Sequence, residues 1–192
     1  MENLKKEIAG CTVCAASLPL GPRPVVAFDK DASIMIIGQA PGTRVHASGI
    51  PWNDPSGDRL RKWLNVDRDT FYDDSKFAIM PMGFCYPGKG SSGDLPPRKE
   101  CAPLWHERIW EQLPNIQLTL LIGAYAQAYY LPETQKQNMT ARIGDFEKHL
   151  ENGFLVMPHP SPRNQLWLKK NPFFESEVVP ILQHIVADSF KL

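Results

Sequence analysis

The chain has no excess of charge of either sign, because its 21 lysine and arginine residues equal its 21 aspartate and glutamate residues. This balance gives no global indication of nucleic-acid binding, so any basic face has to be local. The sequence also has no apolar run approaching the roughly 20 residues that a membrane-spanning helix needs. We therefore expect a protein with no membrane segment.

Targeting signals and repeats are missing as well. The first ten residues, MENLKKEIAG, lack the apolar core of a signal peptide. There is no internal repeat and no low-complexity linker. At 192 residues the chain is long enough to bury a proper core. We expect one domain over residues 1–192, monomeric and cytoplasmic.

Cysteine is scarce, but the four cysteines present follow a metal-type pattern. They form a C-x2-C pair, then after a long gap a C-x15-C pair: Cys11, Cys14, Cys85 and Cys101. In a cytoplasmic protein, paired cysteines indicate metal more often than a disulfide. Four thiolates suit either tetrahedral zinc or a [4Fe–4S] cluster, and spacing alone does not choose between them. Buried or incidental thiols are the alternative.

Buried strands alternate with helices along the chain. Short apolar runs predict strands at residues 34–37, 77–80, 118–122 and 154–157. Helices are expected at residues 3–9, 58–64, 101–113, 124–131, 145–150 and 173–189. The proline-rich residues 18–31 are expected to form an extended surface arm. The alternation predicts an α/β fold of three layers, α/β/α, around a central parallel four-stranded sheet.

The stretch 34–60 carries the strongest functional signal. Its apolar strand runs directly into a turn composed of Gly38, Gln39, Ala40, Pro41 and Gly42. The glycines allow backbone N–H groups to come close to a ligand. An aromatic residue and polar residues follow: Trp52, Asn53, Asp54 and Asp58, with Ser56 expected to cap the next helix. This arrangement predicts a site at the carboxyl-terminal edge of a parallel sheet, whereas a plain connection is the alternative.

Taken together, the motifs make the chain resemble the uracil-DNA glycosylase superfamily. GQAPG at 38–42 is similar to the first motif of the iron–sulfur glycosylases of families 4 and 5. HPSPRN at 159–164 is similar to the second motif, and the cysteine pairs occur in the order of those branches. The resemblance implies a [4Fe–4S] cluster on the four cysteines and DNA containing a damaged base as the partner. It also implies hydrolysis of the N-glycosidic bond of uracil, or a related deaminated base, flipped out of DNA.

The chain departs from both families at positions that matter. Gln39 stands where family 4 enzymes carry a glutamate, so that acid is missing. Family 5 enzymes use an aspartate just before an SGD helix start, a pattern that Asp54 fits. Trp52 is the nearest counterpart of the phenylalanine that stacks on the flipped base. The asparagine that reads the uracil edge has no match in residues 80–84, so the chain resembles an unnumbered branch and the preferred base is open.

Base removal needs two stabilising groups, because the sugar becomes oxocarbenium-like while the base departs as an anion. Asp54 is the candidate for the negative group under the sugar, where it also orients or deprotonates water. His159 and the backbone N–H groups of the turn at 38–42 are the candidates at the base. Trp52 and Asn53 complete the predicted base site. Asp58 is the reserve candidate for the acid, and a helix-start role is the alternative for Asp54.

The second motif supplies the predicted DNA contacts. Ser161, Pro162, Arg163 and Asn164 are expected to contact DNA, the last three as a wedge in the gap left by the flipped base. Lys169 and Lys170 are candidates for phosphate contacts. Two other functions remain open at this point. One is a non-catalytic DNA-lesion binder of the same fold, and the other is an unrelated nucleotide-acting α/β enzyme with a zinc site.

Overall fold

Four parallel strands form the centre of the computed structural model, which describes residues 1–190. Their order across the sheet is β2-β1-β5-β6, and every neighbouring pair is parallel. The strands are β1 (Ile34–Ile37), β2 (Phe77–Ile79), β5 (Leu118–Ile122) and β6 (Phe154–Met157). All residues of β1 and β5 are buried, as expected where helices cover both faces of a sheet. The predicted central parallel sheet is confirmed.

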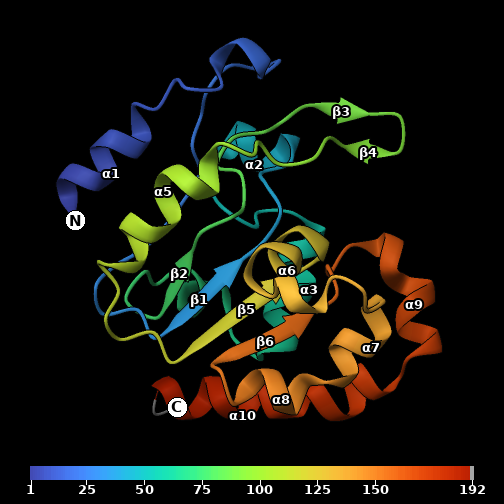
Figure 1. Cartoon of the computed structure of the whole chain (residues 1–192). Coiled ribbons are helices and arrows are strands. Elements are labelled where there is room, and N and C mark those ends of the chain that lie inside the picture. The colour runs from blue at the N-terminus through green and yellow to red at the C-terminus, as the bar shows by residue number, and fades with distance from the viewer. Residues whose placement is uncertain (191–192) are drawn as a thin grey trace.

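Helices lie on both faces of this sheet, with α6 in front and α3 behind in the view of Figure 1. The α-helices are α1 (Glu2–Ala9), α2 (Thr43–Ser48), α3 (Pro55–Leu64), α4 (Arg68–Phe71), α5 (Cys101–Trp110), α6 (Ala124–Tyr130), α7 (Met139–Gly144), α8 (Phe146–Leu150), α9 (Gln165–Lys170) and α10 (Val179–Phe190). The three-layer α/β/α fold is therefore confirmed. The short helices α2, α4, α7 and α9 were not predicted. Within residues 1–190 no helix combines the length and apolar character needed to cross a membrane.

Helix α3 begins earlier than the sequence pattern predicts, at Pro55 instead of Asp58. Its cap is Asp54, whose Oδ1 accepts a hydrogen bond from the Gly57 N–H at 2.8 Å. The expected cap at Ser56 is therefore wrong. Asp54 has the extended backbone that a cap requires, and proline suits the first helical position because its missing N–H would have no partner there.

The proline-rich residues 18–31 are not a surface arm. Leu18, Val25 and Phe28 are buried. Ala27 pairs antiparallel with Ile79, exchanging backbone hydrogen bonds of 3.0 and 2.6 Å with it. The segment thus covers the otherwise open edge of β2, where a sheet would expose unpaired backbone groups.

A small hairpin interrupts the long loop after β2. Its strands are β3 (Lys89–Gly90) and β4 (Gly93–Asp94), which pair antiparallel with each other. Figure 1 shows the hairpin projecting beyond the carboxyl ends of the central strands. It therefore lies on the side of the sheet where a ligand site is expected.

A buried histidine joins α5 to the loop after β2. The Nε2 of His106 lies 3.1 Å from the Pro81 carbonyl oxygen, and its Nδ1 lies 2.7 Å from the Tyr130 hydroxyl. A carbonyl can only accept, so Nε2 carries the proton and Nδ1 accepts from Tyr130. The Tyr130 oxygen in turn accepts from the Trp110 indole N–H at 3.3 Å. Burial lowers the pKa of His106 to about 4, against the smaller opposing effect of the Pro81 carbonyl.

This lowered pKa predicts that His106 destabilises the protein in acid. The folded form holds fewer protons than the unfolded form, whose histidine titrates near 6.5. The contribution of neutral His106 to the free energy of unfolding is therefore fully present above about pH 6.5 and is lost as the pH falls towards 4. At about 1.4 kcal/mol per pKa unit, the loss is about 3 kcal/mol. In urea titrations, His106→Gln should flatten the pH dependence, whereas His184→Gln, at an exposed site, should not. Equal slopes in all three proteins would contradict the assignment.

Candidate functional site

The loops that form the candidate site follow the carboxyl ends of the four central strands. The turn at 38–42 follows β1, Pro81 follows β2, Gly123 follows β5 and His159 follows β6. The chain leaves β1 to form β2 on one side and later forms β5 on the other. This change of direction opens a crevice at the carboxyl ends of β1 and β5, where ligands bind in open α/β sheets.

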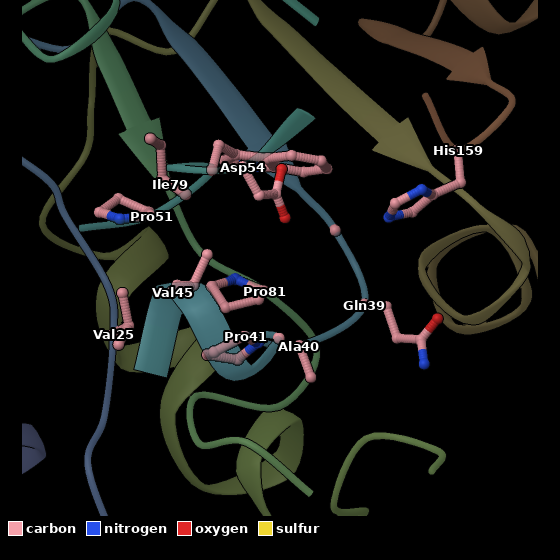
Figure 2. Close-up of a pocket in the computed structure, with 13 residues that line it drawn as sticks. Val25, Gln39, Ala40, Pro41, Val45, Pro51, Asp54, Ile79, Pro81 and His159 are labelled. Carbon is pink, nitrogen blue, oxygen red and sulfur yellow. The ribbon is translucent and has the colours of Figure 1, made fainter. Parts of the chain in front are cut away.

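The crevice contains a pocket, shown in Figure 2, with about 420 Å³ of space between atoms, part of which is open to solvent. Its lining residues are Val25, Gly38, Gln39, Ala40, Pro41, Gly42, Val45, Pro51, Trp52, Asp54, Ile79, Pro81 and His159. A broader outer groove continues from it along Ser56, Asp94, Ser161, Arg163 and Asn164. Five residues line both spaces and so form the mouth of the pocket: Gln39, Ala40, Gly42, Asp54 and His159.

His159 lies half-buried at this mouth, on the loop that follows β6. Its carbonyl oxygen accepts a hydrogen bond from the Asn164 side-chain amide at 2.8 Å, which closes the loop on itself. Burial lowers the pKa of His159, while the carboxylate of Asp54 acts in the opposite direction. The imidazole is therefore neutral near pH 7, with one N–H to donate and one nitrogen to accept.

The structure separates the two candidate acids. Asp54 lines both the pocket and the outer groove while one of its oxygens caps α3. Asp58 lines neither space, and its carboxylate is paired with the buried guanidinium of Arg61. A residue one turn further along the helix thus faces a different partner. Of the two, the geometry brings Asp54 to the same pocket as His159.

Trp52 forms one wall of the pocket and has an unusual backbone. Its φ of 55° is left-handed, a conformation that costs a non-glycine residue about 1–3 kcal/mol. A Cβ at Gly38 would lie 2.8 Å from the indole, and one at Gly57 would lie 1.7 Å from the Trp52 carbonyl oxygen. Arg61 Nη1 donates to that oxygen at 3.4 Å. The indole centroid lies 5.6 Å from that of His159, with 34° between the rings.

Two predicted base-site residues have different surroundings. Gln39 is at the mouth, where its side-chain N–H donates to the Leu95 carbonyl beside the β3–β4 hairpin at 3.3 Å. Asn53 lines neither the pocket nor the outer groove. Its side-chain oxygen instead accepts a hydrogen bond from Arg68 at 2.9 Å. The structure thus brings Gln39, but not Asn53, to the pocket.

The second motif lies along the outer groove, except for Pro160 and Pro162, which line neither the pocket nor the groove. The Ser161 hydroxyl oxygen accepts from the Arg163 N–H at 3.2 Å. The guanidinium of Arg163 donates to the Ser92 carbonyl at 2.7 Å, across the tip of the β3–β4 hairpin. A Cβ at Gly93 would lie 2.1 Å from that guanidinium. Arg163 therefore braces the hairpin in this structure.

Several residues in and around the pocket carry little or no signal in the sequence. Val25 belongs to the segment expected at the surface, and Val45 belongs to the unpredicted helix α2. Asp94 lies in the β3–β4 hairpin, where no strand was predicted. Arg61 has one recognisable feature, its i,i+3 spacing from Asp58. Such spacing is common on exposed helices, so it does not reveal that Arg61 supports Trp52.

The four cysteines line one separate cavity, together with Arg98 and Trp105 among other residues. Burial, with smaller contributions from neighbouring thiols, raises the pKa of Cys14, Cys85 and Cys101, and the resulting pKa of Cys101 is about 12. Such thiols stay protonated alone, but a bound cation would favour their thiolate forms. In the described residues, no group of three or more His, Cys, Asp or Glu side chains is arranged to hold a metal ion. The structure gathers the four cysteines, and the identity of their ligand stays a prediction.

The chain was also compared with protein families. The family model described as "Uracil DNA glycosylase superfamily" matches residues 25–183. The match begins at Val25 in the pocket wall and includes the four central strands, the turn at 38–42 and His159. Cys11 and Cys14 precede the matched residues.

The surroundings of His159 lead to a prediction about its titration. The pKa of His159 should lie below the 6.5 of an unperturbed histidine, because burial disfavours the imidazolium form. Asp54→Asn should lower it further, since the carboxylate is the group that raises it. NMR titration of the imidazole resonances measures both shifts. A pKa above 6.5, or one that rises in Asp54→Asn, would show that the ring is not in this environment.

Proposed function

Because the chain belongs to the uracil-DNA glycosylase superfamily, we propose that it is a DNA repair glycosylase that acts on a base flipped out of DNA. The reaction is hydrolysis of the N-glycosidic bond of uracil or a related deaminated base. One observation carries the proposal. The Asp54 carboxylate and a neutral His159 lie at the mouth of one pocket, beside the glycine-containing turn after β1.

These two residues serve opposite ends of the same charge separation. As the bond between C1′ and the base nitrogen breaks, its electron pair leaves with the base and C1′ becomes positive. Asp54 stabilises that positive charge and takes a proton from the water that adds to C1′. His159 and the backbone N–H groups of the turn donate to the base oxygen that becomes negative. Removing one such donor costs about 3 kcal/mol in comparable oxyanion sites.

Trp52 fits the role of the surface that receives the flipped base. Extrusion from the duplex costs a few kcal/mol of unstacking, and stacking on an aromatic ring returns roughly 1–3 kcal/mol. The indole lines the pocket beside His159, in space that Gly38 leaves open, and Arg61 binds the Trp52 backbone carbonyl before any ligand arrives. A fixed ring loses little conformational freedom when a base stacks on it.

The outer groove is the proposed path of the DNA strand. Ser161, Arg163 and Asn164 line the groove next to the mouth, Pro162 is exposed beside them, and Lys169 and Lys170 are exposed at the end of α9. Since the Arg163 guanidinium already binds the Ser92 carbonyl, its contribution includes holding the hairpin at the groove. A few local cations of this kind suit a chain whose net charge is zero.

We propose that Cys11, Cys14, Cys85 and Cys101 hold the [4Fe–4S] cluster implied by the family resemblance, with zinc as the alternative, and their position around one cavity supports this. The donor set consists of four thiols from three separate segments. When bound, the cluster would supply a structural cross-link and no redox step. It would connect the residues after α1 to the loop after β2 and to the start of α5. The Arg108–Glu7 ion pair already joins α5 to α1 at 2.6 Å.

The catalytic assignment predicts a loss of activity that is separable from folding. Asparagine caps helices about as well as aspartate, so Asp54→Asn should keep α3 capped and remove only the charge. Excision of uracil from an oligonucleotide should fall roughly 100-fold or more while DNA affinity changes little, as expected when only transition-state stabilisation is lost. Asp58→Asn is the matched control, because that residue lies on the same helix and outside the pocket. Full activity in Asp54→Asn, or loss confined to Asp58→Asn, would reassign the acid. Binding to damaged DNA without any excision by the unaltered protein would support a lesion binder instead.

The cysteine assignment predicts a coloured protein. Freshly purified protein should be brown, with broad visible absorption and close to four iron atoms per chain as expected for a [4Fe–4S] cluster. Cys101→Ser should remove the colour and lower thermal stability. Colourless protein with one zinc per chain would replace the cluster by zinc, and metal-free protein with four free thiols would contradict both.

A further inference from the structure

The part of the pocket behind the mouth is apolar. Eight lining residues do not reach the outer groove: Val25, Gly38, Pro41, Val45, Pro51, Trp52, Ile79 and Pro81. We call these eight residues the inner wall. None of them carries a charged group, a hydroxyl or a side-chain amide, and the Trp52 indole N–H is the one polar side-chain group among the eight. In Figure 2, Val25, Pro51 and Ile79 lie on the side of the pocket opposite Gln39 and His159.

The backbone of the inner wall also offers few free polar groups. Its three prolines have no N–H to donate. Both backbone groups of Ile79 are bonded to Ala27. The Val25 N–H donates to the Phe84 carbonyl at 2.7 Å, and the Gly38 carbonyl accepts from the Met82 N–H at 2.9 Å.

Three further carbonyl groups on this wall also have hydrogen-bond partners. The Pro81 oxygen accepts a hydrogen bond from His106, the Trp52 oxygen accepts one from Arg61, and the Val45 oxygen accepts one from the Gly49 N–H. A hydrogen-bonding edge of a base pressed against this wall would find few partners. Each polar atom left unpaired there would weaken binding substantially.

We infer that the inner wall receives an apolar substituent of the base and that the site selects deaminated bases bearing a 5-methyl group, namely thymine formed from 5-methylcytosine. The inference rests on the proposed function. In a pyrimidine, C5 lies across the ring from C2. With its O2 directed to the donors at the mouth, the base directs its 5-position to the inner wall.

Thymine is also a normal base, so selection has to include its pairing partner. A thymine opposite guanine is mismatched and costs less to unpair than one opposite adenine. The pocket then recognises the methyl group, and the mismatch provides access. An extra methyl group in an apolar pocket changes kcat/KM by about 10-fold or more.

The experiment compares excision of thymine and uracil, each opposite guanine, by the full-length protein. We expect kcat/KM for thymine to be at least equal to that for uracil, with little excision of thymine opposite adenine. Val45→Thr keeps the size of the side chain but places a hydroxyl in the inner wall. It should lower the ratio of kcat/KM for thymine to kcat/KM for uracil roughly 10-fold. Val25→Thr repeats the test from a different segment in case the first variant folds poorly. Val66→Thr, outside the pocket and groove, should leave the ratio unchanged.

The outcomes separate this inference from the proposed function. If uracil is excised and thymine is excised less than a tenth as well, or if both wall variants leave the ratio unchanged, the inference is overturned and the glycosylase activity stands. If the folded protein excises neither base, the proposed function fails. Thymine excision that the wall variants selectively reduce supports both.

Discussion

The left-handed backbone of Trp52 is the constraint on which the site depends. It turns the chain sharply between the loop after α2 and the start of α3, with φ at 55°. The turn is possible only because Gly57 leaves room for the Trp52 carbonyl and Gly38 leaves room for the indole. Arg61 then binds that carbonyl from within α3. Backbone strain of this kind persists where the surrounding packing over-determines it, and such residues concentrate at functional sites.

The position of Asp54 follows from this turn. Two residues after Trp52 the chain enters α3, and Asp54 caps the helix while lining the mouth of the pocket. The structural role and the proposed chemical role therefore use the same side chain. The cap holds the carboxylate in one place, as preorganised electrostatic stabilisation requires. His159 is held from the opposite side by the loop after β6, and burial keeps its imidazole neutral.

The pocket divides its polar and apolar groups by depth. Donors and charges lie at the mouth, where the proposed bond cleavage would develop charge, and the inner wall is made of aliphatic side chains, prolines, Gly38 and the Trp52 indole. Arg163 donates to the Ser92 carbonyl at the tip of the hairpin, and Gln39 donates to the carbonyl of Leu95, the residue after β4. These two contacts hold the hairpin beside the mouth. These contacts join parts of the chain that are more than 50 residues apart. The hairpin, the turn and the second motif consequently form one continuous rim.

The sequence by itself determined the sheet and the principal motifs, because these depend on local patterns. Apolar runs located the four strands, and the turn at 38–42 and His159 follow strand ends, so a parallel sheet brings them to one edge. Only the tertiary structure decided which neighbouring side chains reach the pocket. Asp54 does and Asp58 does not, since one turn of helix places them against different partners. Likewise, Val25 lines the pocket because residues 18–31 cover the edge of β2. That covering depends on a long-range backbone pairing, which a local pattern of prolines does not reveal.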